Sequence, residues 1–509
     1  MSPSTIRVTF FLFFLVCVCC CQSANAQGLT GQISGTLTDS SGGSVINAKI
    51  EVINQKTAQV RTATSDSEGN FVVTELLPGT YSLVASANGF KKFEQTGIVL
   101  TANERVDVHK LALEVGDVNQ TVTITADPAF VKTESAERAG LIDEQQIQSV
   151  ALKGRDYMGL VRLLPGVVDT ANREAPGWNN LVGVNINGSR TGTLNLTLDG
   201  VSSLDTGSQQ GPYLAPGLDA IGEVKVLLTN YQAEYGRSSG GTINVVIKSG
   251  TRDFHGGGFY FKRHEQFNAN EYFNNARLVP KQRYRFNYWG DNIGGPVIIP
   301  GTSFNRNHDK LFFFWSQEYL PRTYPTRQGT ITYPTALERA GDFSKTLDTS
   351  GRLIVIRDPV TGLAFPDNKI PANRIDPNGQ KLLGIFPLPN YDPSLVSYNY
   401  NNVFQSTVNQ PRREEILRMD WNISPKTIFY ARGIHSNEQY KGDFNFVLAS
   451  NVWPQFPIKY QIKAEGLVST LIHTFSPTLT NEFTFGINRA LQTVASRSGR
   501  RPDRLLDRL

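Results

Sequence analysis

The sequence predicts a mainly β protein with three successive parts: a small β-sandwich, a mixed α/β unit and a set of long antiparallel strands. Short strand-like runs separated by turn residues recur between Gly28 and Thr251. After Phe254, apolar and polar residues alternate, as in strands with one buried face. No stretch after residue 26 approaches the roughly 18 apolar residues of a membrane-spanning helix. Strands are therefore expected to carry most of the fold.

Residues 1–26 have the features of a secretory signal peptide. Arg7 precedes an apolar run, Val8–Val16, and the small residues Ala24-Asn25-Ala26 follow. Cleavage is expected between Ala26 and Gln27. A lipid anchor on a cysteine is the alternative, although Val and Cys precede these cysteines rather than the small residues that a lipobox prefers. The four cysteines all lie in this segment, so the exported chain is expected to lack disulfides and cysteine metal sites: Cys17, Cys19, Cys20 and Cys21.

Charge and motifs predict neither a nucleic-acid partner nor an enzyme. The formal charge is +5 over 509 residues, and Lys and Arg form no run within the body of the chain. The six histidines lack metal-ligand spacing, and no Walker loop, Rossmann fingerprint or HExxH motif is present. A G-x-S-x-G match at Gly236–Gly240 precedes a strand-like run rather than the helix of a nucleophile elbow. We expect no catalytic residue, no cofactor and no metal site.

Residues 28–115 are predicted to form the β-sandwich. Strand-length runs recur about every ten residues, with turn residues between them. Tyr81, Leu83 and Ala85 alternate with Ser82, Val84 and Ser86, which predicts a half-buried strand. The sequences Thr64–Phe71 and Leu77-Pro78-Gly79-Thr80-Tyr81 resemble the carboxypeptidase-regulatory-like domain, a transthyretin-like sandwich. That resemblance implies no peptidase activity.

Residues 116–127 form a linker that contains the β-prone run Thr121, Val122, Thr123, Ile124, Thr125 and Ala126. Asp127-Pro128 ends the run. One interpretation is an extended strand with unpaired backbone groups, available to pair with the edge strand of another protein. The alternative is that this run is the last strand of the preceding sandwich.

Residues 128–251 are predicted to be the α/β unit. Two helices are expected, one capped at Asp143 and reaching Val150, the other from Arg155 to Leu164, where Pro165-Gly166 ends it. Short β-runs follow, cut by turn dipeptides such as Asn187-Gly188 and Asp199-Gly200. The order of helix, LPGV, NINGSR, LDGV and GGTINVVIKSG resembles the plug domain of TonB-dependent outer-membrane receptors. In such receptors, a strand at the position of Thr121–Ala126 is the TonB box.

Residues 252–509 show the alternation of a transmembrane antiparallel β-barrel. Aromatic or apolar residues share one parity and polar residues the other, so the apolar face is expected to meet lipid and the polar face the lumen. Three runs illustrate the pattern: Tyr284, Phe286 and Tyr288 against Arg283, Arg285 and Asn287; Met419, Trp421 and Ile423 against Arg418, Asp420 and Asn422; Phe483, Phe485 and Ile487 against Glu482, Thr484 and Gly486.

A predicted hairpin, Asn292–Ile299 with Asp309–Trp315, resembles the first barrel strands of the Oar-like branch of these receptors. The N-terminal sandwich favours the same branch. Barrels of this family close about 22 strands around a plug, whereas residues 254–509 supply only about 8 to 10 at typical strand lengths. The barrel is therefore expected to be incomplete, and the chain to be the N-terminal part of a longer protein.

The resemblance implies an outer-membrane receptor that takes up a carbohydrate, peptide or metal chelate. Its expected partners are the TonB–ExbB–ExbD energy-coupling complex, outer-membrane lipid and an unidentified extracellular ligand. Adhesion or protein export by an Oar-like outer-membrane protein is the alternative function. A soluble secreted carbohydrate-binding protein is a third possibility. The sequence identifies no ligand-binding residue.

Overall fold

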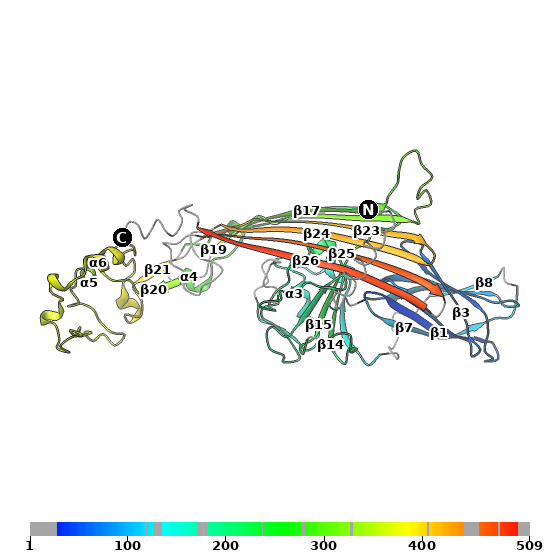
Figure 1. Cartoon of the computed structure of the whole chain (residues 1–509), viewed down its shortest axis with the longest axis horizontal. Coiled ribbons are helices and arrows are strands. Elements are labelled where there is room, and N and C mark those ends of the chain that lie inside the picture. The colour runs from blue at the N-terminus through cyan, green and yellow to red at the C-terminus, as the bar shows by residue number, and fades with distance from the viewer. Residues whose placement is uncertain are drawn as a thin grey trace, which may run out of the picture.

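The computed structural model describes residues 28–117, 120–125, 135–171, 177, 181–236, 238–276, 280–325, 329–404, 407–441, 458–476 and 479–496. The predicted signal peptide, with its cleavage site between Ala26 and Gln27, lies outside these residues, as does Ala126. A β-sandwich and an α/β unit lie side by side against a curved sheet of long strands (Figure 1). A loop-rich lobe lies beyond the opposite end of that sheet from the sandwich. The mainly β fold is confirmed.

The sandwich packs two sheets around one apolar core. One sheet has the order β4-β1-β7 and the other β3-β2-β5-β6-β8. Side chains on β1 alternate between buried and half-buried, and the buried ones include Ile33 and Leu37 of the core. The strands are β1 Gly31–Asp39, β2 Lys49–Asn54, β3 Val60–Thr64, β4 Asn70–Leu76, β5 Gly79–Ser86, β6 Lys92–Leu100, β7 Arg105–Leu113 and β8 Thr121–Thr125.

The central strand β5 differs from the half-buried strand that its sequence predicts. Tyr81, Leu83 and Ala85 belong to the core, as expected. Ser82 and Val84, on the other face, are buried as well. The strand lies between β2 and β6, and the side chain of Gln55 reaches over it to donate a hydrogen bond to Ser82 at 2.9 Å. Neighbouring elements therefore cover both faces.

The α/β unit contains a five-stranded sheet of order β13-β12-β15-β14-β9 and a separate pair, β10 with β11. Every residue of β15 is buried, because β12 and β14 flank it and the long sheet covers it. The strands are β9 Arg138–Ile142, β10 Val167–Asp169, β11 Val184–Ile186, β12 Asn195–Leu198, β13 Val201–Ser202, β14 Ile221–Thr229 and β15 Thr242–Ile247. The helices are α2 Glu144–Ser149, α3 Met158–Val161 and η1 Leu218–Ala220.

One of the two predicted helices is shorter than expected. Helix α2 begins after Asp143, whose carboxylate accepts a hydrogen bond from the Gln146 N–H, so this capped helix is confirmed. The helix predicted from Arg155 to Leu164 is limited to the four residues of α3. Arg155 has a φ of +56°, in the left-handed region, so a right-handed helix cannot include it. Tyr157, Leu160 and Val161, within the predicted range, are nevertheless in the core.

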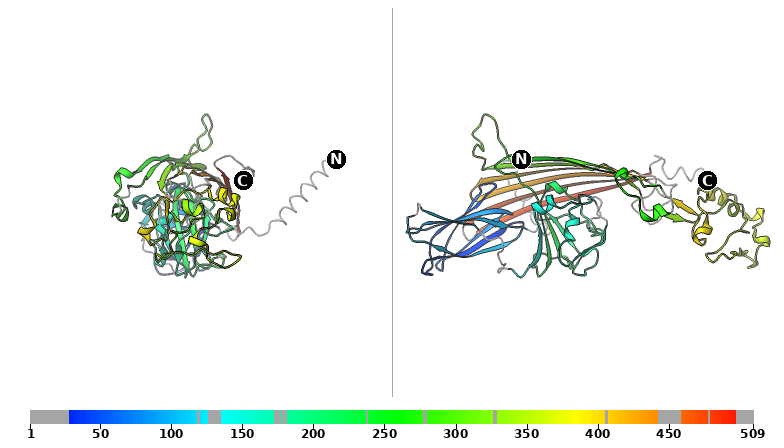
Figure 2. Two further views of the ribbon diagram at one scale, coloured as in Figure 1. Left: turned by 90° about the vertical axis from the view of Figure 1, so that its left-hand side faces the viewer. Right: turned by 180° about the vertical axis from the view of Figure 1, so that it is seen from behind.

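The long strands form one antiparallel sheet, which we call the wall. Its described strands are β16 His255–His264, β17 Arg285–Pro296, β18 Leu311–Tyr319, β19 Arg322–Pro325, β22 Thr407–Gln410, β23 Arg412–Ser424, β24 Thr427–Lys441, β25 Ile458–Ser476 and β26 Leu479–Ser496. The predicted hairpin is present as β17 and β18, with Gly294 opposite Phe314. Viewed end-on, the wall curves over the α/β unit (Figure 2). Its concave face therefore contacts protein, and its convex face is open.

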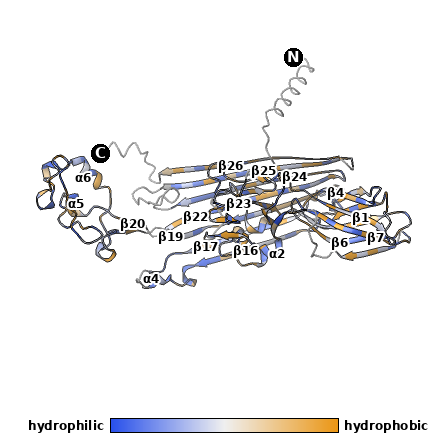
Figure 3. Cartoon of the chain, turned by 90° about the horizontal axis from the view of Figure 1, so that it is seen from below, coloured by the Kyte–Doolittle hydropathy of each residue, from blue (hydrophilic) through white to orange (hydrophobic). Residues whose placement is uncertain are grey.

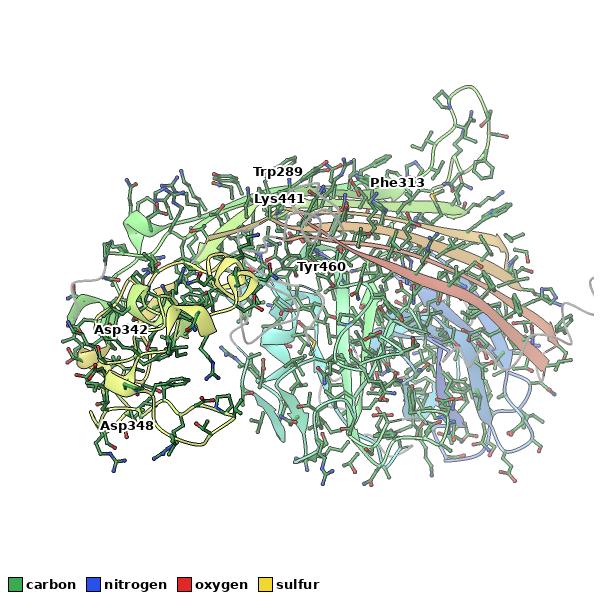
Figure 4. The ribbon with its side chains drawn as sticks, turned by 60° about the vertical axis from the view of Figure 1, so that its left-hand side comes forward. Trp289, Phe313, Asp342, Asp348, Lys441 and Tyr460 are labelled. Carbon is green, nitrogen blue, oxygen red and sulfur yellow. The ribbon has the colours of Figure 1, made fainter. Side chains whose placement is uncertain are left out.

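The two faces of the wall follow the predicted alternation, with one exception. Hydrophobic and hydrophilic positions alternate along the long strands (Figure 3). Phe483, Phe485 and Ile487 are 51 to 61% exposed on the convex face, as predicted. Figure 4 shows Trp289 and Phe313 on this outer side and Tyr460 on the inner side.

The exception is the beginning of β17, where the prediction of an aromatic face toward lipid is wrong. Phe286 and Tyr288 are 3% exposed and face inward, while Arg285 is exposed. The two rings stack at 5.5 Å between centroids. They form a cluster with Leu320, and the Arg263 guanidinium lies 5.2 Å from the Phe286 ring. The alternation of aromatic and polar residues defines two faces of the strand, but it does not show which of them points inward.

Residues 329–404 form the lobe. The two-stranded pair β20 Gly329–Ile331 and β21 Asn402–Phe404 connects it to the wall (Figure 1). Its helical segments are α5 Ala336–Arg339, η3 Pro366–Asn368, η4 Ala372–Arg374, α6 Pro377–Leu383 and η5 Pro393–Val396. Two further short helices, η2 Glu265–Phe267 and α4 Tyr272–Ala276, follow β16. Across the described residues, no helix is both long enough and apolar enough to cross a membrane.

The sandwich core allows a matched test of packing. Val52 on β2 is fully buried, whereas Val99 on β6 is 59% exposed. Val52→Ala removes two buried methyl groups and should destabilise the sandwich by about 2 kcal/mol. Val99→Ala should change its stability by less than about 0.5 kcal/mol. Hydrogen exchange of sandwich amides, followed by mass spectrometry in the full chain, measures both. Equal effects would contradict the assigned core.

Candidate functional site

The α/β unit is joined to the concave face of the wall by buried charges, first of all by Asp199. This residue follows β12 in a turn with a left-handed φ of +48°. Its carboxylate accepts a hydrogen bond from Arg432 Nε at 2.8 Å and another from the Ile247 N–H at 2.9 Å. Asp199 and Arg432 are both fully buried. One carboxylate thus connects the sheet of the α/β unit to β24 of the wall.

Arg418 of β23 extends this ion pair. Its Nη1 atom donates to the carbonyl of Ile247 at 2.7 Å and lies 3.7 Å from Asp199 Oδ1. Its Nη2 atom pairs with Asp420 at 2.8 Å. The sequence predicted that Arg418 and Asp420 face the lumen, and both are buried on the concave face. Burying an ion pair costs desolvation energy. Removing one partner is nevertheless strongly destabilising, because the other charge is then buried without a counter-charge.

A second charged cluster joins the unit to the wall through the segment before η1. The Gly217 N–H donates to Glu414 Oε1 at 2.6 Å, and Arg412 donates to the carbonyl of Ala215 and to Glu414. Arg155 pairs with Asp219 and lies 3.5 Å from Glu318 of β18. Its guanidinium also lies 4.0 Å from the centroid of the Phe259 ring, in a cation–π arrangement. The wall thus contacts the α/β unit through charged groups at two separate places.

The sandwich is docked on both neighbouring parts. Lys225 of β14 is 2% exposed, donates to the carbonyl of Ala102 at 2.8 Å and pairs with Glu137 at 3.0 Å. Glu223 accepts from the Ala102 N–H at 2.8 Å. Toward the wall, Arg61 of β3 donates to the Thr474 hydroxyl at 3.0 Å. A small apolar cluster joins all three parts: Leu29, Ala102, Val246, Tyr430 and Val468.

A polar cavity of about 990 Å³ lies where sandwich, α/β unit and wall meet. Lys248 Nζ lies 2.9 Å from Glu144 Oε1 at its edge. Burial opposes ionisation of Glu144, but Lys248 and Lys56 outweigh this effect and lower the pKa of its carboxyl. Charged side chains that line the cavity come from all three parts and include Lys56, Glu144, Lys248, Arg252, Arg418 and Asp420. The cavity is suited to water and ions rather than to an apolar ligand.

The lobe is organised by polar side chains. Asn368 Nδ2 donates to the carbonyls of Phe343 at 2.7 Å and Ile354 at 2.9 Å. Arg374 forms two hydrogen bonds with Asp358, at 2.7 and 3.1 Å, which hold the pKa of that carboxyl well below its ordinary value. Large apolar side chains remain exposed on the surface: Val360, Leu363 and Leu395. The lobe therefore offers both polar and apolar contact area.

Of the predicted TonB-box residues, Thr121–Thr125 lie at an edge of the sandwich. Thr121–Thr125 form β8, which pairs in parallel with β6, so that Thr123 lies opposite Glu94. This is the position expected from the alternative interpretation of the run as a sandwich strand. It leaves the role of the run as a TonB box a prediction, because an edge strand can still accept a partner.

Sequence reasoning missed the buried charges between the α/β unit and the wall. Asp199 was noted only as part of a turn dipeptide. Glu318, Glu414 and Arg432 were not singled out, although each has the inward parity of its strand. A charged residue at an inward position of a long strand was the available signal, because such a charge needs a buried partner.

Comparison with known families follows the same division of the chain. A model described as "Outer membrane beta barrel domain" matches residues 246–505, just over half of the chain. The chain belongs to this family. A "Carboxypeptidase regulatory-like domain" model matches residues 32–114. The "TonB-dependent transporter Oar" of Myxococcus xanthus is 28% identical over 270 residues, which are 50% of this chain and 23% of that relative.

Solved structures with detectable similarity include a transporter and a receptor. The outer-membrane transporter YddB from Escherichia coli is 10% identical, with a TM-score of 0.41, over 69% of this chain and 38% of its own. The siderophore receptor PirA from Acinetobacter baumannii is 14% identical, with a TM-score of 0.38, over 70% of this chain and 40% of its own. The chain thus spans less than half the length of these relatives.

The outer-membrane barrel family agrees with the sequence motifs, and half of the chain is similar to an Oar-like TonB-dependent transporter, as those motifs predicted. The matched relative from Myxococcus xanthus is a transporter. The soluble, secreted alternative is set aside, because the family model is that of an outer-membrane domain.

The Asp199 pair should dominate retention of the α/β unit. Asp199→Asn leaves the buried guanidinium of Arg432 without a counter-charge and should weaken the attachment by about 3 to 5 kcal/mol. Limited proteolysis of the full chain in detergent should then cut the α/β unit faster. Asp253→Asn, the same change at an exposed position, serves as the control. Unchanged proteolysis of the Asp199 variant would show that the pair does not retain the unit.

The Asp358–Arg374 pair should govern the acid stability of the lobe. Because the folded pKa of Asp358 is depressed, its stabilising effect is present above the unfolded pKa of about 4 and is lost as pH falls through the lower folded value. Amide protection in the lobe, corrected for intrinsic rates, should therefore be equal at pH 7 and about pH 5. Asp358→Asn should reduce it at both pH values, whereas Lys345→Met, at an exposed lysine, should not. Loss of protection in the wild type between pH 7 and 5 would contradict this role.

Proposed function

We propose that this chain belongs to an outer-membrane receptor that takes up an extracellular ligand with energy supplied through the TonB–ExbB–ExbD complex. The observation that carries the proposal is the α/β unit seated on the concave face of the wall. It is held there by ion pairs at two separate places, between Asp199 and Arg432 and between Arg155 and Glu318. A part held in this way acts as a plug that must move before a ligand passes.

Buried charge pairs suit a plug that moves and returns. When the α/β unit is displaced and water enters, the carboxylate of Asp199 and the guanidiniums of Arg418 and Arg432 regain hydration. Separation therefore costs less than exposing two apolar surfaces of similar area would. When the α/β unit docks on the wall again, the same charges permit only one position, because a misplaced charge would be buried without a partner. Displacement still requires work, which the energy-coupling complex would supply.

The proposal also assigns a direction of uptake to the two ends of the wall. The lobe lies at the opposite end of the wall from the sandwich (Figures 1 and 2). We assign the lobe to the extracellular side and the sandwich, with the candidate TonB box Thr121–Ala126, to the periplasmic side. Polar groups and exposed apolar side chains of the lobe would contact the ligand first. Carbohydrate, peptide and metal chelate remain candidate ligand classes.

Adhesion or protein export is the second candidate function. The exposed apolar side chains Val360, Leu363 and Leu395 of the lobe favour it, since such residues are typical of protein contacts. Adhesion does not require an energised plug. The two functions therefore differ in their dependence on the candidate TonB box.

Deletion of Thr121–Ala126 separates these functions. Cells that produce the native receptor would be offered labelled oligosaccharides, peptides and ferric chelates. We expect one class to accumulate, and accumulation to fall at least tenfold with a protonophore or with the deletion. Replacing Thr121, Thr123 and Thr125 together by Ser keeps the backbone and should preserve uptake. Accumulation that survives the deletion would contradict energised uptake, and cell adherence that is unaffected by it would support the second function.

A further inference from the structure

The sandwich has an unprotected sheet edge at β8. Of the sandwich strands that the structure describes, four lie at sheet edges: β3, β4, β7 and β8. An exposed edge is a template for pairing with another strand, so folded proteins usually guard it with charges, bulges or covering elements. The four edges differ in this respect.

Three of these edges are guarded. Arg61 of β3 is buried against the wall, where it donates to Thr474. In β4, Glu75 has a left-handed φ of +57°, and the Thr30 hydroxyl lies within hydrogen-bond distance of its carboxylate, at 2.8 Å, and of the Glu482 carboxylate of the wall, at 2.6 Å. β7 carries several charges and a bulge at His109, whose φ is +60°. None of the three offers a flat, open edge.

β8 lacks all of these devices. Its sequence, Thr121-Val122-Thr123-Ile124-Thr125, contains no charge and no proline, and its pairing with β6 has no register shift. Four of its five side chains are exposed. Within the described residues, no strand pairs with its other edge. The strand is thus ordered by backbone pairing on one side and open to a second partner on the other.

The direction of its backbone groups can be assigned. Gln120, just before β8, accepts a hydrogen bond from the Lys92 N–H of β6 at 2.8 Å. Backbone groups alternate along a strand, so those of Val122 and Ile124 also point to β6. The N–H and C=O groups of Thr121, Thr123 and Thr125 consequently point away from the sandwich. These three residues present the donors and acceptors of the open edge.

We propose that the periplasmic coupling protein adds a β-strand to this open edge while β8 remains paired with β6. The sandwich and the coupling protein would then share one continuous sheet, with β8 between them. This inference rests on the proposed energy coupling and adds how the coupling strand is presented. The sandwich holds the strand extended before the partner arrives, which reduces the entropy cost of pairing.

This arrangement gives the sandwich a role in transmitting force. A pull on β8 is distributed through β6 to the body of the sandwich. The sandwich contacts the α/β unit through Lys225 and Glu223, both bound to Ala102, and the wall through Arg61. Force would therefore reach the α/β unit through this docked surface as well as along the chain.

A disulfide between β6 and β8 tests whether the strand stays in place. Glu94 and Thr123 lie directly opposite each other, and all native cysteines lie within residues 1–26. The full chain with Glu94→Cys and Thr123→Cys would be oxidised, and its binding to the purified periplasmic domain of TonB measured. The controls are the reduced form and each single variant.

The outcomes separate this inference from the proposed function. Oxidised and reduced forms that bind with affinities within about threefold support a bridging strand. Binding only after reduction would overturn the bridge, since β8 must then leave β6, while energy coupling through this strand would stand. No binding by the wild type or by either form would overturn both.

Substitution at Thr123 tests the assigned edge. Thr123→Pro removes an N–H that points outward and adds a ring on that side, so binding to the TonB domain should weaken at least tenfold, while β8 stays on β6. Thr123→Val keeps the N–H and should bind like the wild type. Amide exchange of β6 reports whether the β6–β8 pairing persists in each variant. Wild-type affinity of the proline variant, with that pairing intact, would contradict use of this edge.

Discussion

The contact between the Asp199 carboxylate and the Arg432 guanidinium is the constraint on which the arrangement of the parts depends. Neither group has contact with water, so each can be buried only with the other. The turn that presents Asp199 ends β12, and the arginine lies on β24, far away in sequence. This pair fixes which face of the α/β unit meets the wall. Arg418, which also lies close to Asp199, lines the polar cavity where the three parts meet.

Much of the fold could be predicted from the sequence because it depends on local patterns. Turn residues at regular spacing indicated the sandwich, and alternating faces indicated the long strands, including the inward position of Arg418. The cap at Asp143 is a local signal, and it identified α2 correctly. The second helix was overestimated, because Arg155 has a left-handed backbone in the structure, where its guanidinium contacts Asp219 and Glu318. No pattern within the helix itself carries that information.

The candidate site was harder to predict for the same physical reason. Asp199, Glu414 and Arg432 come together from separate strands, and a buried charge shows its function only beside its counter-charge. The inward aromatic cluster at Phe286 and Tyr288 reversed the expected face of one strand, since alternation gives two faces without saying which is inside. The open edge of β8 likewise depends on which strands pair. The sequence shows that this strand is uncharged and rich in threonine, but it does not show which strand pairs with it.

The attachment of the lobe has a consequence for how such a receptor diversifies. Residues 329–404 join the wall through a single pair of short strands, β20 and β21, and their internal order comes from their own turns and polar contacts. Substitutions or exchanges in the lobe can therefore accumulate without disturbing the buried charges beneath the wall. Selection can change what is recognised at one end while the machinery at the other end is inherited intact.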